Sequence, residues 1–270
     1  MRYYIIAGEA SGDLHGSNLM KGIYAEDPKA EIRFWGGDLM ESVWKQHEVD
    51  TSAVNRHSGL VRHYKEGAVM GFMEVLSKAR KLLGNVSFCK KDILGWKPDV
   101  VILIDYPGFN FKIAEFAHNA GFKVFDYIAP KVWASREGRI RKLKAYVDKL
   151  FIVFPFEKPY FDAKGISYIY KGNPLVDAVD GSKAMNETRE EVLFRAGLED
   201  RPVIAMLAGS RKPEISTMMP VLTEFASKLH QIPEYSDYQF LIAGAPARSM
   251  TDYEPWMTEE NKQFIKILFG

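Results

Sequence analysis

The sequence lacks the features that would place it in several large classes of protein. Among 270 residues there is one cysteine, Cys89, so the chain can build neither an internal disulfide framework nor a cysteine-based zinc cluster. No apolar run approaches the ~20 residues of a membrane-spanning helix, and no secretion signal is expected at the N-terminus. The net charge of +1 gives no general attraction for nucleic acid. A soluble protein with Cys89 as a buried, inert thiol beside Phe88 is expected.

What is present is an alternation of apolar segments with amphipathic ones, which predicts an α/β fold with parallel strands. Strands are expected at residues 3–7, 31–35, 100–104, 123–128, 149–154, 167–170, 203–207, 239–243 and 263–269. Helices are expected at residues 16–25, 40–47, 72–94, 111–120, 140–146, 157–163, 188–196 and 218–229. Residues 50–68 are expected to be irregular. A turn at Gly172, Asn173 and Pro174 predicts two domains, 1–172 and 173–270.

The most informative stretch is the small-residue segment that follows the first predicted strand. Gly8, Gly12 and Gly16 permit backbone angles and close approaches that a Cβ atom would forbid. Ser11 and Asp13 are favoured helix caps, and they either cap the next helix or face a ligand. A helix N-terminus also presents unpaired N–H groups that suit an anion. The segment therefore predicts a ligand site at the end of the first strand.

Seven segments, in chain order, resemble the motifs of the lipid-A-disaccharide synthase family of inverting glycosyltransferases. They read AGEASGDLHG at 7–16, MGFMEVL at 70–76, IDYPGFN at 104–110, YIAPKVWASR at 127–136, FPFEK at 154–158, GNPLVD at 172–177 and LAGSRKPEI at 207–215. Ala129 and Ser135 depart from the family's pattern in the fourth segment. Because the segments span most of the chain in the right order, coincidence is improbable.

The resemblance implies a GT-B architecture of two Rossmann-like domains, of which the second is incomplete at Gly270 because family members continue further. It implies transfer of 2,3-diacylglucosamine from UDP-2,3-diacylglucosamine to the 6-hydroxyl of 2,3-diacylglucosamine 1-phosphate (lipid X). The products are the β-1,6 lipid A disaccharide 1-phosphate and UDP. Domain 1–172 is then the acceptor side and domain 173–270 part of the UDP-sugar side. The chain is expected to be a fragment that is inactive alone, and no cofactor is implied.

An inverting transfer needs a base that takes the proton of the acceptor hydroxyl. Asp105 is the first candidate, because it follows the apolar strand at 100–104, where a parallel sheet delivers residues to its crevice. The structural alternative is that Asp105 caps the next turn. Glu9 and His15 compete for the role, since the glycine-rich segment can bring either to a hydroxyl and an unperturbed histidine titrates near neutral pH. The sequence leaves the choice among these three open.

Substrate contacts are expected in both domains. In the first domain, the resemblance assigns them to Ser11, Gly12, Asp13 and Asn110. In the second, the loop of Ser210, Arg211 and Lys212 lies between a strand and a helix, so its N–H groups and guanidinium suit the UDP diphosphate. The sequence has no D-x-D arrangement of the kind that holds Mg²⁺, so transfer without a metal is expected.

Acylated substrates imply an apolar surface and a position on the inner membrane from the cytoplasmic side. Met70, Phe72 and Met73 precede a basic flank at Lys78, Arg80 and Lys81, a pattern typical of an interfacial segment. An amphipathic helix packed in the core would give the same pattern. The expected partners are UDP-diacylglucosamine, lipid X and the inner-membrane lipid surface, with no nucleic acid; a homo-oligomer stays open.

Two other functions remain open on the sequence alone. A related GT-B enzyme, such as a UDP-N-acetylglucosamine 2-epimerase, would share the architecture and the UDP site but would need no acyl-binding surface. A fragment that binds a nucleotide or a lipid without catalysis is the second. Turnover of a soluble UDP-sugar, with no turnover of acylated substrates, would favour the epimerase.

Overall fold

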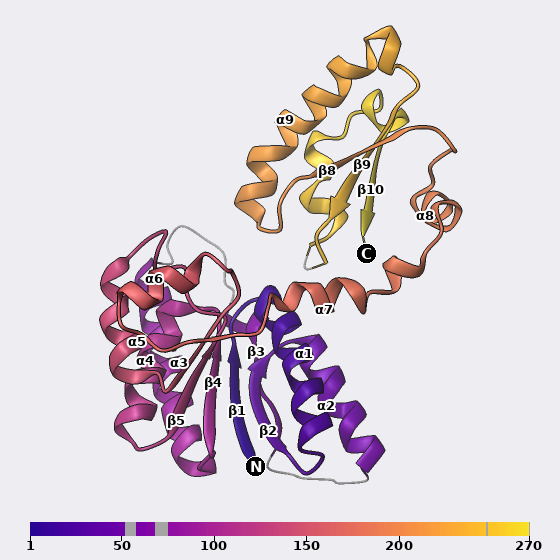
Figure 1. Cartoon of the computed structure of the whole chain (residues 1–270). Helices are drawn as coiled ribbons and strands as arrows, with labels where there is room; N and C mark the ends of the chain where they lie inside the picture. Colours follow the sequence, from indigo (N-terminus) through magenta and orange to yellow (C-terminus); the bar gives the residue numbers. More distant parts are fainter. Residues whose placement is uncertain (52–57, 68–74, 247, 270) are drawn as a thin grey trace. The chain divides into compact units, whose positions relative to one another are not determined.

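The computed structural model describes residues 1–51, 58–67, 75–246 and 248–269, and these form two compact units, Met1–Gly181 and Ser182–Gly270 (Figure 1). Each unit is built around its own parallel sheet. The boundary between them follows α7 (Pro174–Asp180). The prediction of an α/β fold with parallel strands is therefore confirmed in both units.

The larger unit holds a seven-stranded sheet in the order β3-β2-β1-β4-β5-β6-β7, with every neighbouring pair parallel. Its strands are β1 (Arg2–Ala7), β2 (Glu31–Gly36), β3 (Gly59–His63), β4 (Val100–Ile104), β5 (Lys123–Tyr127), β6 (Lys149–Ile152) and β7 (Ile169–Tyr170). Its α-helices are α1 (Ala10–Glu26), α2 (Asp38–Thr51), α3 (Val75–Trp96), α4 (Pro107–Asn119), α5 (Ile140–Tyr146), α6 (Glu157–Ala163) and α7. This order is that of a Rossmann-like sheet.

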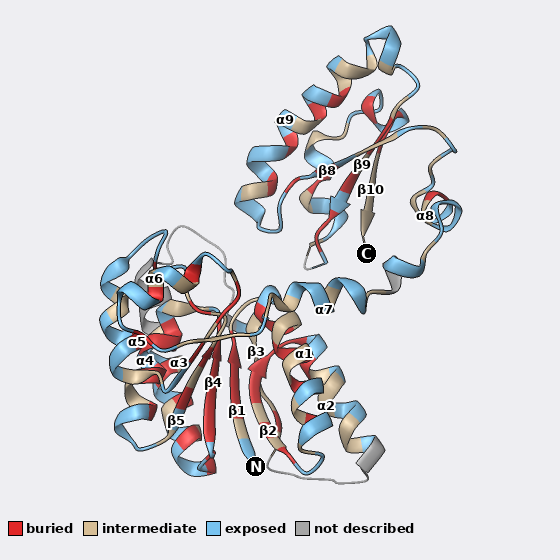
Figure 2. Ribbon diagram, in the orientation of Figure 1, coloured by how far each residue is buried: buried red, intermediate tan, exposed pale blue. Residues whose placement is uncertain are grey.

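Helices cover both faces of this sheet, and each face has its own apolar core (Figure 2). Side chains alternate between the faces along a strand, so Tyr4 and Ile6 of β1 pack with α3 and α4, whereas Ile5 packs with α1 and α2. The central strand β4 is apolar and buried along its whole length. Because β4 is held so firmly, the residues that follow it are placed at a fixed point on the edge of the sheet.

The smaller unit holds a three-stranded parallel sheet in the order β10-β9-β8. Its strands are β8 (Val203–Leu207), β9 (Gln239–Gly244) and β10 (Ile265–Phe269), and its α-helices are α8 (Arg189–Ala196) and α9 (Lys212–His230). Ile215 and Met219 of α9 pack with Phe240 and Ile242 of β9 in the core of this unit. A Thr188–Glu191 capping box begins α8, so its predicted start is confirmed.

Three helices begin at least four residues earlier than the sequence predicts. We expected starts at residues 16, 111 and 218, whereas α1, α4 and α9 begin at Ala10, Pro107 and Lys212. Glycine and proline caused these errors, because they were taken as loop residues. Proline is tolerated in the first turn of a helix, and Pro107 lies in that turn of α4. The glycine-rich segment is therefore mostly the first turns of α1.

Other expectations are also corrected. The segment 50–68 was expected to be irregular, but it contains β3 and a short 3₁₀ helix, η1 (Tyr64–Gly67). Helix α7 was not predicted, although Asn173 Oδ1 accepts a hydrogen bond from the Leu175 N–H and so caps it. Cys89 is buried, and burial raises the pKa of its thiol, which agrees with an inert role. No helix in the described ranges combines the length and the apolar character needed to cross a membrane.

Candidate active site at the carboxyl edge of the larger sheet

The chain order of the sheet reverses between β1 and β4, which are hydrogen-bonded neighbours. Parallel α/β sheets bind ligands outside the carboxyl ends of the strands at such a point. Glu9 follows β1 and Asp105 follows β4, so the topology brings two of the three predicted base candidates to this edge. Gly8 packs directly beneath the ring of Tyr106, where a Cβ atom would overlap the ring.

Backbone strain is concentrated at the same edge. Asp105 and Tyr106 have φ angles of 48° and 61°, and Ile128, just after β5, has a φ of 73°. Non-glycine residues rarely adopt these left-handed conformations, and an Ile there is a clear outlier. Each costs on the order of 1–3 kcal/mol and persists where the surrounding structure enforces it, often at functional sites. The strained turn aims Asp105 away from the core, and its Oδ1 accepts a hydrogen bond from the Tyr106 N–H at 2.9 Å.

Asp105 borders a small recess between the ends of β4 and β5. The recess has a volume of about 10 Å³ and is lined by Leu103, Asp105, Pro107, Asn110, Phe111, Asp126, Ile128 and Pro130. Asn110 is buried, and its Nδ2 donates to the carbonyl oxygens of Ile104, at 3.4 Å, and of Asp105. Asn110 therefore holds the strained turn that carries Asp105.

His15 projects from α1 toward the same edge and interacts electrostatically with Asp105. Burial lowers the pKa of His15 from its usual value, and the negative charge of Asp105 opposes this effect only in part. Its buried Nδ1 has no hydrogen-bond partner among the described residues. The imidazole is therefore neutral at neutral pH and able to accept a proton.

Glu9 occupies the N-cap position of α1, but its side chain does not cap the helix. It lies near Tyr106: burial raises the pKa of that phenol, and the charge of Glu9 raises it further. The structure thus brings Glu9, His15 and Asp105 to one edge. Which of them is the base stays a prediction.

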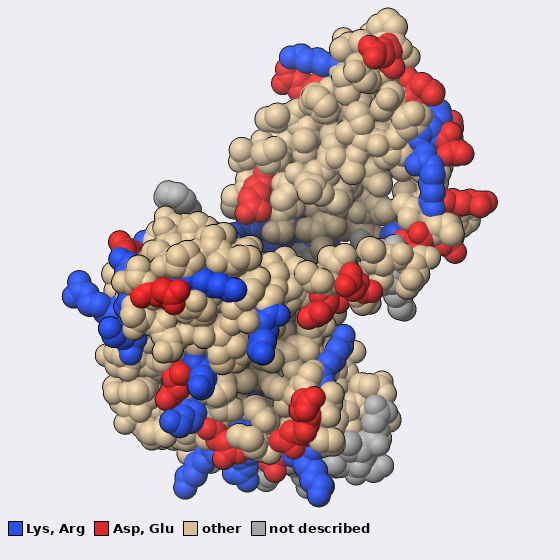
Figure 3. Space-filling view, viewed as in Figure 1, with Lys and Arg blue, Asp and Glu red and all other residues tan. Residues whose placement is uncertain are grey.

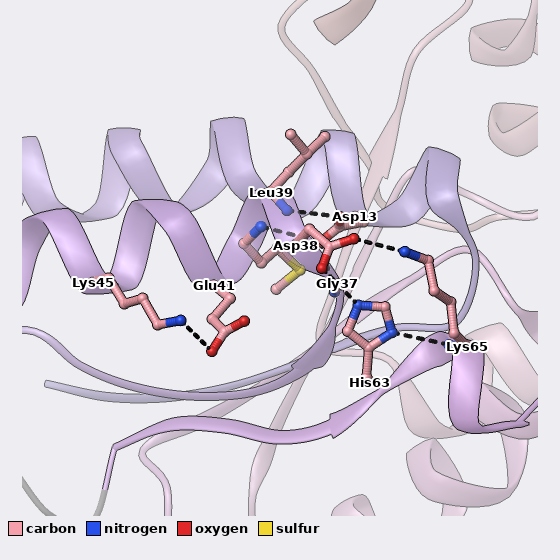
Figure 4. A network of polar contacts seen from close by, with 9 residues as sticks. Asp13, Gly37, Asp38, Leu39, Glu41, Lys45, His63 and Lys65 are labelled. Carbon is pink, nitrogen blue, oxygen red and sulfur yellow. Dashed lines mark hydrogen bonds and ion pairs between the residues drawn. The ribbon is translucent and has the colours of Figure 1, made fainter. Parts of the chain in front are cut away.

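Asp13 has a clear role in holding the fold. Its carboxylate is 2% exposed and accepts hydrogen bonds from the N–H groups of Gly37, Leu39 and Met40 at 2.7, 3.0 and 3.1 Å (Figure 4). These donors begin α2, so Asp13 joins α1 to α2. Beside it, the exposed Asp38 pairs with Lys65 at 2.8 Å and with His63 at 3.3 Å.

The other small residues of the segment also have packing roles. Gly12 is buried against Ala7 and the backbone of β4, and a Cβ atom on Gly16 would overlap the side chain of Met40. None of Gly8, Gly12 and Gly16 has a positive φ, so close approach explains them and unusual dihedrals do not. Ser11 is exposed in the first turn of α1. A substrate contact through Ser11, Gly12 or Asp13 stays a prediction.

Asp126 was not among the residues predicted from the sequence. Its side chain is 7% exposed and lines the recess beside Asp105. Burial, followed by the negative charge of Asp105, raises the pKa of Asp126 to about 8. A polar residue inside the apolar strand at 123–128 was the available signal, because an acid in a buried strand needs a reason.

The predicted phosphate loop lies in the smaller unit, between β8 and α9. The N–H groups of Ser210 and Arg211 both donate to Oε2 of Glu214, at 2.9 and 3.1 Å. Glu214 Oε1 also lies 3.5 Å from the Arg211 guanidinium, and Lys212 pairs with Asp252 at 3.4 Å. The groups expected to bind a diphosphate are present, but an internal carboxylate now occupies the two N–H donors.

Met70, Phe72 and Met73, the predicted acyl and membrane contacts, lie outside the described residues. On the face drawn in Figure 3, positive and negative side chains are interspersed, in keeping with the net charge of +1. Among the residues that the structure describes, no group of three or more His, Cys, Asp or Glu side chains could hold a metal ion.

Comparison with known proteins identifies close relatives of the whole chain. A family model described as lipid-A-disaccharide synthetase matches residues 3–269. The lipid-A-disaccharide synthase of Geobacter metallireducens is 37% identical over 265 residues, which cover 98% of this chain and 64% of the relative. That of Syntrophus aciditrophicus is 38% identical, with 95% and 61% covered. The chain thus spans less than two thirds of the length of these relatives.

Solved structures share the fold at much lower identity. The UDP-GlcNAc 2-epimerase from Neisseria meningitidis, bound to UDP-GlcNAc, has a TM-score of 0.64 and 13% identity, covering 100% of this chain and 72% of that one. An S. aureus MnaA–UDP complex has a TM-score of 0.66 and 15% identity, with 99% and 68% covered. At these identities the likeness concerns the fold alone. It confirms the predicted Rossmann-like α/β class.

Proposed function

The chain belongs to the lipid-A-disaccharide synthase family, and from this premise we propose that it supplies the acceptor side and part of the donor side of a glycosyltransferase of lipid A biosynthesis. The reaction transfers 2,3-diacylglucosamine from UDP-2,3-diacylglucosamine to the 6-hydroxyl of lipid X. It releases UDP and forms the β-1,6-linked disaccharide. The relatives' identities of 31–38% favour this activity over that of the epimerases, whose identities here are 13–16%.

The observation that carries the proposal is the strained Asp105 at the switch point of the sheet. In the transfer, Asp105 accepts the proton of the 6-hydroxyl while that oxygen bonds to the anomeric carbon and the bond from this carbon to UDP breaks. Attack from the face opposite UDP inverts the anomeric centre. The neutral His15 and the carboxylate of Glu9 lie at the same edge and complete the polar lining.

Leaving-group binding is the role we propose for Ser210, Arg211 and Lys212. Arg211 and Lys212 carry positive charge at the N-terminus of α9, where the helix dipole also favours an anion. A bound diphosphate would take the place of the Glu214 carboxylate on the Ser210 and Arg211 N–H groups. The donor side would therefore reorganise when UDP binds.

We also propose that the protein works on the inner-membrane surface from the cytoplasmic side, because both substrates carry acyl chains. Met70, Phe72 and Met73 are the proposed acyl contacts, with the basic flank of Lys78, Arg80 and Lys81 against anionic lipid. Sedimentation with anionic vesicles that weakens in high salt would support this role. Vesicle binding unchanged in Met70→Ser and Phe72→Ser would remove these residues from it.

The test of the function is a transfer assay with UDP-2,3-diacylglucosamine and lipid X, read by mass spectrometry of the disaccharide. It is run on this chain and on a form extended to the length of its relatives. We expect product from the extended form and none from the chain alone. Turnover of soluble UDP-GlcNAc, with no disaccharide from either form, would contradict the proposal.

A further inference from the structure

The recess beside Asp105 contains a buried acid for which the proposed transfer has no use. Asp126 lies opposite Leu103 in the β4–β5 pairing, and it enters the recess from β5. Within the described part of the chain, its carboxyl group makes no hydrogen bond, and the nearby negative charge of Asp105 acts on it. A buried carboxylate without a donor is strongly unfavourable. Keeping a proton lowers that cost and makes Asp126 a hydrogen-bond donor.

Asn110 also lines the recess and carries an acceptor without a donor. Both partners of its Nδ2 are carbonyl oxygens, those of Ile104 and Asp105, so the orientation of the amide is fixed by chemistry. Its Oδ1 is buried and has no partner among the described residues. A buried amide oxygen left in this way costs free energy until a donor reaches it.

The residues that line the recess therefore carry one donor and two acceptors beside a small space. The donor is the protonated Asp126, and the acceptors are Asn110 Oδ1 and the Asp105 carboxylate. Its volume of about 10 Å³ is close to the smallest that holds one water-sized oxygen. An oxygen that accepts one hydrogen bond and donates one or two matches this set, as a water molecule or a sugar hydroxyl does.

We propose that this recess binds a single hydroxyl-sized oxygen, from water or from a sugar, between Asp126, Asn110 and Asp105. Asp126 donates to the bound oxygen, which in turn donates to Asn110 or Asp105. Asp126 is thus a positioning residue: it acts on Asp105 through the bound oxygen and adds no second negative charge. Occupancy of the recess is independent of the proposed function, whereas the effect on transfer rests on it.

Few other ionisable groups surround the recess. His15 on α1 interacts with Asp105, and the Arg139 guanidinium lies 5.5 Å from the centre of the Phe111 ring, which lines the recess. Besides burial, the negative charge of Asp105 raises the pKa of Asp126. Replacing Asp105 by Asn should therefore lower that pKa, since a nearby like charge raises the pKa of an acid.

The experiment follows the aspartate carboxyl carbons of the 270-residue chain by ¹³C NMR between pH 3 and 10. We expect one aspartate with a midpoint near pH 8, absent in Asp126→Asn and lowered by about one pH unit or more in Asp105→Asn. Asp180→Asn, which removes an exposed carboxylate on α7, should leave the midpoint unchanged. Absence of any midpoint above pH 6, or the same midpoint in Asp105→Asn, would overturn the proposal.

Stability provides a second measurement. The folded pKa of Asp126 lies above its unfolded value of 3.8, so its contribution is fully present below about pH 4 and is lost as pH rises to about 8. The Tm of Asp126→Asn should therefore rise relative to that of the wild type as the pH increases from about 4 to about 8. Parallel Tm profiles of the two proteins would contradict a protonated, buried Asp126.

Glucosamine 1-phosphate, the acyl-free head group of the proposed acceptor, separates the two sources of the oxygen. A change in the Asp126 midpoint when this sugar is added assigns the site to a sugar hydroxyl, and glucose 6-phosphate, whose 6-hydroxyl is blocked, serves as the control. A midpoint near pH 8 that the sugar leaves in place excludes a sugar hydroxyl and leaves water as the source of the oxygen. Neither result depends on glycosyl transfer, so failure of this proposal would not contradict the proposed function.

Discussion

The strand ends of the two units differ in how their polar groups are satisfied. In the larger unit, His15 Nδ1, Asn110 Oδ1 and the carboxyl group of Asp126 find no hydrogen-bond partner among the described residues. In the smaller unit, the corresponding turn satisfies itself: Glu214 binds the N–H groups of Ser210 and Arg211. Both turns follow a parallel strand, β4 buried along its whole length and β8 buried only at Met206, and the turns differ in the side chains that reach their polar groups.

This difference determines what a ligand has to do in each unit. An unpartnered buried group gains a hydrogen bond when a ligand arrives, so the edge of the larger sheet is preorganised for binding. In the smaller unit, a diphosphate bound as proposed would first have to displace a carboxylate, and only the remaining free energy would appear as affinity. We therefore expect most changes to the polar groups of the larger unit to reduce activity. Changes in the loop of the smaller unit can either weaken or tighten UDP binding.

The largest expected effect is on Asp105. In a form extended to the length of the relatives, Asp105→Asn should slow the chemical step by about 10²–10⁴-fold, the usual contribution of a general base. Acceptor affinity should change little, because the amide keeps the size of the carboxylate. Single-turnover transfer measures the step directly. A rate within a few-fold of the wild type would move the base to Glu9 or His15, and Glu9→Gln and His15→Gln would then be compared.

Asp13 offers a contrast within the larger unit, because its buried carboxylate, unlike the carboxyl group of Asp126, accepts hydrogen bonds from the protein itself. Asp13→Ala leaves three backbone N–H groups at the start of α2 without their acceptor and should lower the free energy of unfolding by about 3–5 kcal/mol. Asp13→Asn is the matched control: its Oδ1 keeps the bonds to Gly37 and Met40 and loses only that to Leu39. Hydrogen exchange at these three amides reports the loss locally. Equal protection in both variants would refute the capping role.

The fold was largely predictable from the sequence, because burial of parallel strands leaves continuous apolar runs such as residues 100–104. Boundaries failed where glycine or proline sits inside a helix: close packing of Gly12 and Gly16 against neighbours, and not loop geometry, explains those residues. The strand at 59–63 was missed because its burial is mostly partial, which leaves a weak apolar pattern. Local sequence does not show what a glycine packs against.

The candidate site was predictable in its centre and not in its surroundings. Asp105 follows from a buried strand that ends in an acid, and the switch point of the sheet then brings it near Glu9 and His15. Asp126 could not be foreseen, because its importance depends on pairing between β4 and β5 and on the charge of Asp105. Likewise, Glu214 is three residues from Arg211 in sequence, but only the structure shows that it binds the loop.

A smaller effect is expected for Arg211 on the donor side. The 270-residue chain, with part of the proposed donor side, should bind UDP weakly or not at all. In the extended form, Arg211→Ala should cost ~1.5–3 kcal/mol of UDP affinity, the range for a hydrogen bond to a charged group. Calorimetry on the two lengths makes the measurement. Indifference of the extended form to Arg211→Ala would remove the leaving-group assignment.

The smallest expected effect has the opposite sign and concerns Glu214. Glu214→Gln removes a negative charge from the loop and weakens its hold on the N–H groups of Ser210 and Arg211, so UDP displaces a poorer competitor. We expect UDP binding by the extended form to tighten by about two- to tenfold, the size of one net hydrogen bond, while the start of α9 loses some stability. Glu224→Gln, which breaks an exposed pair with Lys228 farther along the same helix, is the control and should leave affinity unchanged. Weaker UDP binding in Glu214→Gln would show that this carboxylate shapes the loop for the diphosphate, and the contrast between the two units would then fail on the donor side.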